Sequence, residues 1–99
     1  MRDLSNGRSQ GEPKGKLTWT DSKVALIELM YALQARGVFN NGIADLKEIV
    51  AFFEDTFGIE VGQYHRTFLE IRIRKTGRTK FLDSLRDSLT RRMDEADDK

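Results

Sequence analysis

The residues with the clearest chemical potential lie close together, in the segment 62–80, GQYHRTFLEIRIRKTGRTK. Residues 62–92 hold nine Lys or Arg against three Asp or Glu, a net charge of +6. The rest of the chain holds eight basic against thirteen acidic residues, a net charge of −5, so the whole chain is nearly neutral at +1. A concentrated positive charge of this kind attracts polyanions, among them nucleic acids.

A helix over about 63–75 would sort these side chains onto separate faces. Tyr64, Phe68 and Ile71 fall together on the side expected to contact the core. Leu69 and Ile73 fall on an adjoining side, which the first or the fourth helix is expected to cover. The remaining polar arc is expected to face solvent, and it holds Gln63, Arg66, Thr67, Glu70 and Arg74.

Such an arc could read bases in the major groove of DNA, because guanidinium groups pair with guanine and carboxamides with adenine. Recognition helices use their N-terminal positions for this contact. The predicted base-reading residues are Gln63, Arg66, Thr67 and Arg74.

The TGRT segment that follows, 76–79, suits phosphate contacts, since its small residues let the backbone approach and its hydroxyls can donate. Phosphate contacts set register and affinity without choosing sequence. The predicted phosphate-binding residues are His65, Lys75, Arg78, Thr79 and Lys80.

Glycines and turn residues divide the chain after residue 16 into four periodic segments, which predicts an all-α domain of four helices over 17–99. The first helix begins after a cap at Thr20 or Asp21 and runs to Arg36, where Gly37 ends it. Residues 24–33 are apolar on most sides, so this helix is expected to lie centrally. Residues 38–42 are expected to form a short extended piece and a turn.

The second helix is predicted over about 43–57, where apolar residues recur at spacings of three and four, and Gly58 stops it. For the third segment, Ile71 and Ile73 would also suit a strand, but apolar and polar residues do not alternate cleanly, so a helix is favoured. The fourth helix starts from a cap at Thr79 and frays over the acidic residues 94–99. Its apolar stripe comprises Phe81, Leu82, Leu85, Leu89 and Met93.

The second and third helices are joined by a short turn that contains glycine, which is the spacing of a helix-turn-helix unit. Helix pairs with short turns also occur in other small bundles, so the spacing alone does not indicate DNA binding. The polar arc with its arginines is what makes DNA binding the favoured interpretation. No hairpin that could form a wing is evident between the third and fourth helices, and the fourth helix occupies the place of a wing.

Residues 1–16 contain only Met1 and Leu4 as large apolar side chains, too few to offset the entropy of ordering them. They are predicted to form a disordered tail or linker, either leading from an earlier part of a longer protein or serving as a mobile arm. The sequence has no cysteine, which fits a reducing compartment. No apolar run approaches the roughly 20 residues of a membrane span, so the prediction is a soluble, cytoplasmic chain.

Enzyme functions lack their usual residues. There is no Ser/His/Asp arrangement, glycine-rich strand-to-helix loop or phosphate-binding lysine motif. His65 is the only histidine, and without a cysteine or second histidine it cannot anchor a typical zinc site. We therefore predict no enzymatic activity, no metal site and no cofactor. The aromatic residues are predicted to belong to the core: Trp19, Phe39, Phe52, Phe53, Phe57, Phe68 and Phe81.

A simpler interpretation of the basic arc is an ordinary solvated helix face. Glu70 could pair with Arg66 and Arg74, each four residues away, for a few tenths of a kcal/mol, roughly. The Arg91-Arg92 pair would then only stabilise the C-terminal end of the fourth helix.

Residues 16–95 resemble the C-terminal domain of the RteC family, regulators carried on tetracycline-resistance conjugative transposons of Bacteroides and relatives. The most specific pieces are WTDSKVALIELMYAL, GVFNNG and YHRTFLEIRIRKTGRTKFLDSL. The resemblance implies a DNA-binding transcriptional regulator with a helix-turn-helix or winged-helix-like unit that activates excision genes of the element. Family members are longer, which implies a further N-terminal domain. No contact residues are carried over from the family.

The leading prediction is thus a sequence-specific binder of double-stranded DNA. A palindromic site would be bound by two copies of the chain, with half-sites one helical turn, roughly 34 Å, apart. Two other classes stay open: a protein-interaction module whose basic strip meets an acidic protein such as a response regulator or polymerase subunit, and an RNA-binding helical domain.

Overall fold

The computed structural model describes residues 17–98, and these form four α-helices and one short 3-10 turn. The helices are α1 (Lys23–Arg36), α2 (Leu46–Phe57), α3 (Tyr64–Arg72) and α4 (Lys80–Asp97), with the turn η2 (Asn40–Gly42) after α1. There is no strand within residues 17–98. The all-α, four-helix prediction is confirmed. The tail predicted over residues 1–16 lies outside the described part of the chain.

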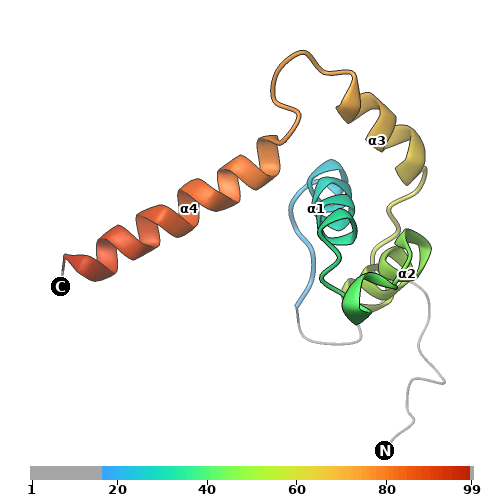
Figure 1. Ribbon diagram of the computed structural model, residues 1–99, viewed down its shortest axis with the longest axis horizontal. Helices are drawn as coiled ribbons and strands as arrows, with labels where there is room; N and C mark the ends of the chain where they lie inside the picture. The colour runs from blue at the N-terminus through green and yellow to red at the C-terminus, as the bar shows by residue number, and fades with distance from the viewer. Residues whose placement is uncertain (1–16, 99) are drawn as a thin grey trace, which may run out of the picture.

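The first helix is the centre of the molecule, and α2, α3 and α4 each pack against it (Figure 1). Its side chains Leu26, Ile27 and Met30 are fully buried. They meet Ile49 and Val50 of α2. The wide apolar surface predicted for this helix therefore has partners on several sides, as expected.

Both ends of α1 follow from local chemistry. The cap is Ser22 rather than Thr20 or Asp21, because the Ser22 hydroxyl accepts the backbone N–H of Ala25 at 3.0 Å. Gly37 ends the helix in the left-handed conformation, with φ 76°. Its N–H donates to the carbonyls of Leu33 and Gln34, and the N–H of Val38 also donates to the carbonyl of Leu33.

The second helix starts three residues later than predicted, at Leu46. The reason is a capping box: the Asp45 carboxylate accepts the N–H of Glu48, and the Glu48 carboxylate accepts the N–H of Asp45. Asp45 therefore caps the helix instead of lying on its polar face. Before it, Asn40 and Asn41 adopt positive φ in η2, so the expected turn is present, and Phe39 before the turn is extended.

The third helix is shorter than predicted and ends at Arg72. Ile73 caps it, and Arg74 and Lys75 belong to the loop that leads to α4. Ile71 is buried, and Tyr64 and Phe68 are half-buried, so the predicted core face of this helix is confirmed.

The fourth helix begins after Thr79 as predicted, yet the Thr79 side chain makes no capping hydrogen bond to the backbone. The cap comes from α1 instead. The buried Glu28 carboxylate accepts the N–H of Phe81 at 3.2 Å and of Leu82 at 2.9 Å. A carboxylate at a helix N-terminus satisfies free N–H groups and complements the helix dipole.

The C-terminal part of α4 extends away from the other helices (Figure 1). It stays helical to Asp97 instead of fraying from residue 94. None of the helices within residues 17–98 has the length and apolarity needed to cross a membrane.

The second and third helices do not pack extensively on each other, since every extensive helix contact among the described residues includes α1. The linker of residues 58–63 joins them as the sequence indicates, and the Glu54 carboxylate holds it by accepting the N–H of Val61 at 3.0 Å. The arrangement does not confirm a helix-turn-helix pair, which remains a prediction.

Candidate nucleic-acid interface

The N-terminal turn of α3 presents polar side chains to solvent. Gln63 is the residue before the helix, its side chain makes no capping hydrogen bond, and it is exposed. Arg66 is also exposed, whereas Thr67 is half-buried. No extensive contact with α4 covers this helix. Two of the four predicted base-reading residues, Gln63 and Arg66, are thus freely accessible at the start of α3.

An aromatic contact fixes the position of α3 on α1. The rings of Tyr31 and Phe68 stack with centroids 3.8 Å apart and an interplanar angle of 7°. The Tyr31 hydroxyl also lies 3.1 Å from Nδ1 of His65. Burial raises the pKa of the Tyr31 hydroxyl above its ordinary value, and nearby Tyr64 raises it further. Tyr31 is therefore protonated at neutral pH and can donate to Nδ1 of His65, which leaves Nε2 of this exposed histidine outside the contact.

The expectation that another helix would cover Leu69 and Ile73 is wrong. Leu69 is 50% exposed and Ile73 is 71% exposed. The reason is the path of the chain after α3: the loop carries α4 to the N-terminal side of α1, where Glu28 caps it, and α4 makes no extensive contact with α3 (Figure 1). The accessible face of α3 is therefore mixed, with apolar side chains beside Arg66.

Arg74 does not share the polar arc of α3 as predicted, because the helix ends two residues before it. Its side chain is half-buried, and Nη1 donates to the carbonyl of Gly77 at 3.0 Å. Arg74 also lines a groove between the N-terminal ends of α1 and α4, together with Glu28 and Lys80. In this position Arg74 shapes the loop.

The α3–α4 loop, residues 73–79, carries the predicted phosphate-binding cations. Lys75, Arg78 and Lys80 at its end are all exposed. The hydroxyl of Thr79 donates to the Asp83 carboxylate at 3.1 Å, so it is engaged within α4. His65 is exposed on α3, held by Tyr31. The loop connects the end of α3 to the start of α4 along one edge of the molecule (Figure 1).

The cations of this region have no acidic partners among the described residues. Glu70 forms no ion pair with Arg66 or Arg74 there, in contrast to the simpler interpretation of the basic arc. The same holds for the exposed Arg72, Lys75, Arg78 and Lys80. Arg86 and Asp87 do approach each other at 3.9 Å, further along α4. The positive charge of α3 and the loop is therefore available to an external anion.

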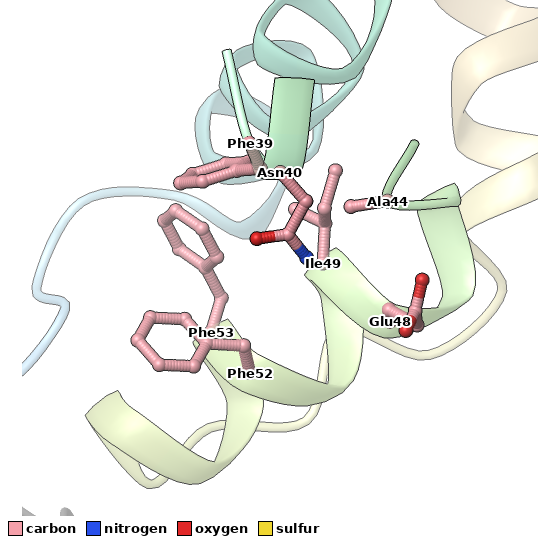
Figure 2. Close-up of a pocket in the computed structure, with 7 residues that line it drawn as sticks. All are labelled: Phe39, Asn40, Ala44, Glu48, Ile49, Phe52 and Phe53. Atoms are coloured by element: carbon pink, nitrogen blue, oxygen red, sulfur yellow. The ribbon is translucent and has the colours of Figure 1, made fainter. Parts of the chain in front are cut away.

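A pocket beside α2 was not predicted. It has a volume of about 310 Å³ and lies between η2 and α2. Figure 2 shows the rings of Phe39, Phe52 and Phe53 gathered at one end and Glu48 at the other. Phe52 is largely exposed there, so its assignment to the core is wrong. Phe52 lies three residues after Ile49, so its spacing gave no signal that it would be exposed.

Of the remaining aromatic residues, Trp19 packs as predicted. Its ring lies 6.1 Å from Phe57 and 5.8 Å from Phe81, centroid to centroid. It thereby joins the end of α2 to the start of α4. This contact and the Glu28 cap together fix where the loop of residues 73–79 ends and α4 begins.

Comparison with known proteins places the chain in a family. No curated protein and no solved structure matches the chain. A family model described as RteC protein matches residues 1–97, nearly the whole sequence, and this match includes the segment 1–16. The residues of α3 and of the basic loop all lie within the matched range, and the chain belongs to the RteC family.

Proposed function

We propose that this chain is a DNA-binding domain of a transcriptional regulator, in which α3 enters the major groove and the α3–α4 loop holds phosphates. The observation that carries the proposal is the set of exposed cations without acidic partners among the described residues: Arg66, Arg72, Lys75, Arg78 and Lys80. They follow one another along α3 and the loop, so a single polyanion could contact all of them.

Gln63 and Arg66 are best placed to read bases. Both are exposed at the N-terminal turn of α3, the position from which recognition helices contact base edges. Arg66 would pair with guanine and Gln63 with adenine. Thr67 is half-buried and Arg74 is bonded to Gly77, so their contribution to base reading is smaller.

Lys75, Arg78 and Lys80 would contact phosphates, which fix the orientation of α3 without selecting a sequence. His65 would add a contact through Nε2, because Tyr31 occupies Nδ1. Thr79 would have to exchange its bond to Asp83 for one to a phosphate. Family membership supports a regulatory role at genes for excision and mobilisation of a conjugative transposon that carries tetracycline resistance.

The test is a fluorescence-anisotropy titration with promoter DNA of the element, a scrambled duplex of the same length, and a salt series. Selective binding to the promoter with steeply salt-dependent affinity supports the proposal. Equal binding to both duplexes contradicts sequence reading, and a lack of binding at low salt contradicts DNA binding altogether.

One observation favours a second candidate, a protein-interaction module that binds an acidic protein. Leu69 and Ile73 are exposed beside Arg66, and an apolar surface rimmed with cations suits an acidic amphipathic partner. Substituting Leu69 with serine separates the candidates. The variant would keep most phosphate-dependent affinity for DNA, whereas a protein partner that buries Leu69 would be lost.

A further inference from the structure

The exposed part of α4 carries an apolar stripe with no partner among the described residues. Every residue from 83 to 97 is exposed, and the large apolar side chains among them are Leu85 at 42%, Leu89 at 56% and Met93 at 55%. Their spacing of four residues places all three within an arc of about 80° on the helix. Leu82, at the start of the stripe, is half-buried.

A helix in this setting gains little stability by itself. In proteins, most helical stability comes from packing an apolar face, and isolated helices of this length are marginal in water. α4 contacts α1 through its first turn, by way of Glu28, Phe81 and Leu82. The free stripe continues this established contact surface along the helix toward the C-terminus.

We propose that the stripe, Leu85, Leu89 and Met93, is the contact surface for a second copy of this chain, with the two α4 helices antiparallel. Around a two-fold axis at Leu89, Leu85 of one copy lies opposite Met93 of the other, and Leu82 lies opposite Ala96. A two-fold contact requires a surface that matches itself in this way. The stripe is centred on Leu89, so it meets that requirement.

The charges at the two ends of α4 determine the orientation. The last turns carry Asp94, Glu95, Asp97 and Asp98 after Arg91 and Arg92, while Lys80 and Asp83 lie in the first turn and Lys75 and Arg78 in the loop before it. An antiparallel pair brings the acidic end of each helix to Lys80 and the basic loop of the other, while Glu95 lies opposite Asp83. A parallel pair would bring four carboxylates of each copy together, and it would also align the helix dipoles unfavourably.

The test of association is the mass of the chain in solution, measured by sedimentation over a concentration series without DNA. We expect a concentration-dependent dimer. Leu89→Glu should weaken dimerisation at least about tenfold, because it places two carboxylates together on the axis. The matched control is Ile43→Glu, the same kind of change at a residue that is 82% exposed before α2, and it should leave the dimer intact.

A monomeric chain at every concentration overturns the proposal, and so does a Leu89→Glu variant that dimerises like the original. Near-ultraviolet circular dichroism of Trp19, the only tryptophan, reports whether the packing of α4 on the domain is preserved in each variant. Since the measurement contains no DNA, its outcome is separate from that of the proposed function.

The orientation has its own test, because the chain has no cysteine and single cysteines can be introduced without background. Under oxidation, Leu89→Cys should form a disulfide-linked dimer. Leu85→Cys by itself should not, because its two copies would be offset by eight residues, about 12 Å along the helix, beyond the reach of a disulfide. A mixture of Leu85→Cys and Met93→Cys should crosslink. Efficient crosslinking of Leu85→Cys alone would establish a parallel pair and overturn the antiparallel one.

Discussion

The carboxylate of Glu28 in α1 accepts the backbone N–H of Leu82 in α4 at 2.9 Å, across 54 positions of sequence. Its other oxygen accepts the N–H of Phe81 at 3.2 Å. Glu28 is only 7% exposed and is the one buried charged residue within residues 17–98. A single side chain of the central helix therefore sets where α4 begins and how the basic loop is closed.

Removing this cap should destabilise the domain. Glu28→Ala leaves two N–H groups of α4 without a partner, and we expect the free energy of unfolding in urea to fall by about 1–3 kcal/mol. Glu28→Gln keeps one acceptor oxygen, so its free energy of unfolding should lie between that of Glu28→Ala and that of the original chain. The control is Glu60→Ala, at an exposed residue, which should change stability by less than about 0.5 kcal/mol. Equal losses at residues 28 and 60 would contradict the capping role.

Arg66 and Lys80 should affect DNA binding differently. Arg66→Ala should cost about 1–3 kcal/mol on the preferred duplex and reduce the preference over scrambled DNA. Lys80→Ala should weaken binding to both duplexes alike. It should also reduce the slope of the logarithm of the binding constant against the logarithm of salt concentration by about 1. Anisotropy titrations at several salt concentrations measure both quantities.

The control for these titrations is Lys47→Ala, which removes the same charge from an exposed position on α2. It should leave affinity and preference unchanged. Equal losses of preference in the Arg66 and Lys80 variants would rule out separate roles in base and phosphate contact.

Gly37 and Gly62 form a matched pair, because both have positive φ, 76° and 71°. At Gly62 an added Cβ meets nothing within 4 Å, so Gly62→Ala should cost only the backbone strain of about 1–2 kcal/mol. At Gly37 the Cβ would lie 3.4 Å from the Cα of Gly42, at the tight limit of van der Waals contact and against backbone. Gly37→Ala should therefore lower the melting temperature more than Gly62→Ala, and the reverse order would contradict this reasoning.

The Tyr31 hydroxyl should contribute to the alkaline pH dependence of stability. Its pKa is raised in the folded state, mainly by burial, so the folded chain holds this proton more tightly than the unfolded chain. The resulting stabilisation is fully present at any pH below the ordinary tyrosine pKa. It is lost as the pH rises through the higher pKa that Tyr31 has in the folded chain. Tyr31→Phe should flatten the decline in unfolding free energy above pH of about 10. If the unfolding free energies of the original chain and of Tyr31→Phe decline in parallel with pH, the Tyr31 hydroxyl does not contribute to the pH dependence of stability.

The sequence predicted the helices well where a local signal existed. Gly37 and Gly58 end α1 and α2 in the left-handed conformation, as expected. The stripe of Leu46, Ile49 and Val50 faces the core. The start of α2 and the end of α3 were missed by a few residues, because the Asp45–Glu48 capping box outweighed the apolar pattern and Ile73 closed the third helix early.

The candidate interface was predicted in part. Gln63, Arg66, Lys75, Arg78 and Lys80 are exposed. Other predicted contact residues have internal partners: Arg74 with Gly77, Thr79 with Asp83, and His65 with Tyr31. The four-residue spacing of Thr79 and Asp83 could have indicated their bond. The bond of Arg74 depends on the turn of the loop, and that of His65 on how α3 packs against α1.

Sequence alone determined which segments are helical, which faces are apolar and where the positive charge is concentrated, because each of these depends on residues three or four positions apart. Only the tertiary structure decided which apolar faces are covered. Leu69 and Leu89 belong to helical stripes and Ile73 directly follows α3, yet all three are exposed. The reason is that α4 is bound to α1 by Glu28 and leaves α3 uncovered, while its own C-terminal part extends away from the other helices. Burial depends on where the other helices lie, and that position is fixed by a contact between residues more than fifty positions apart.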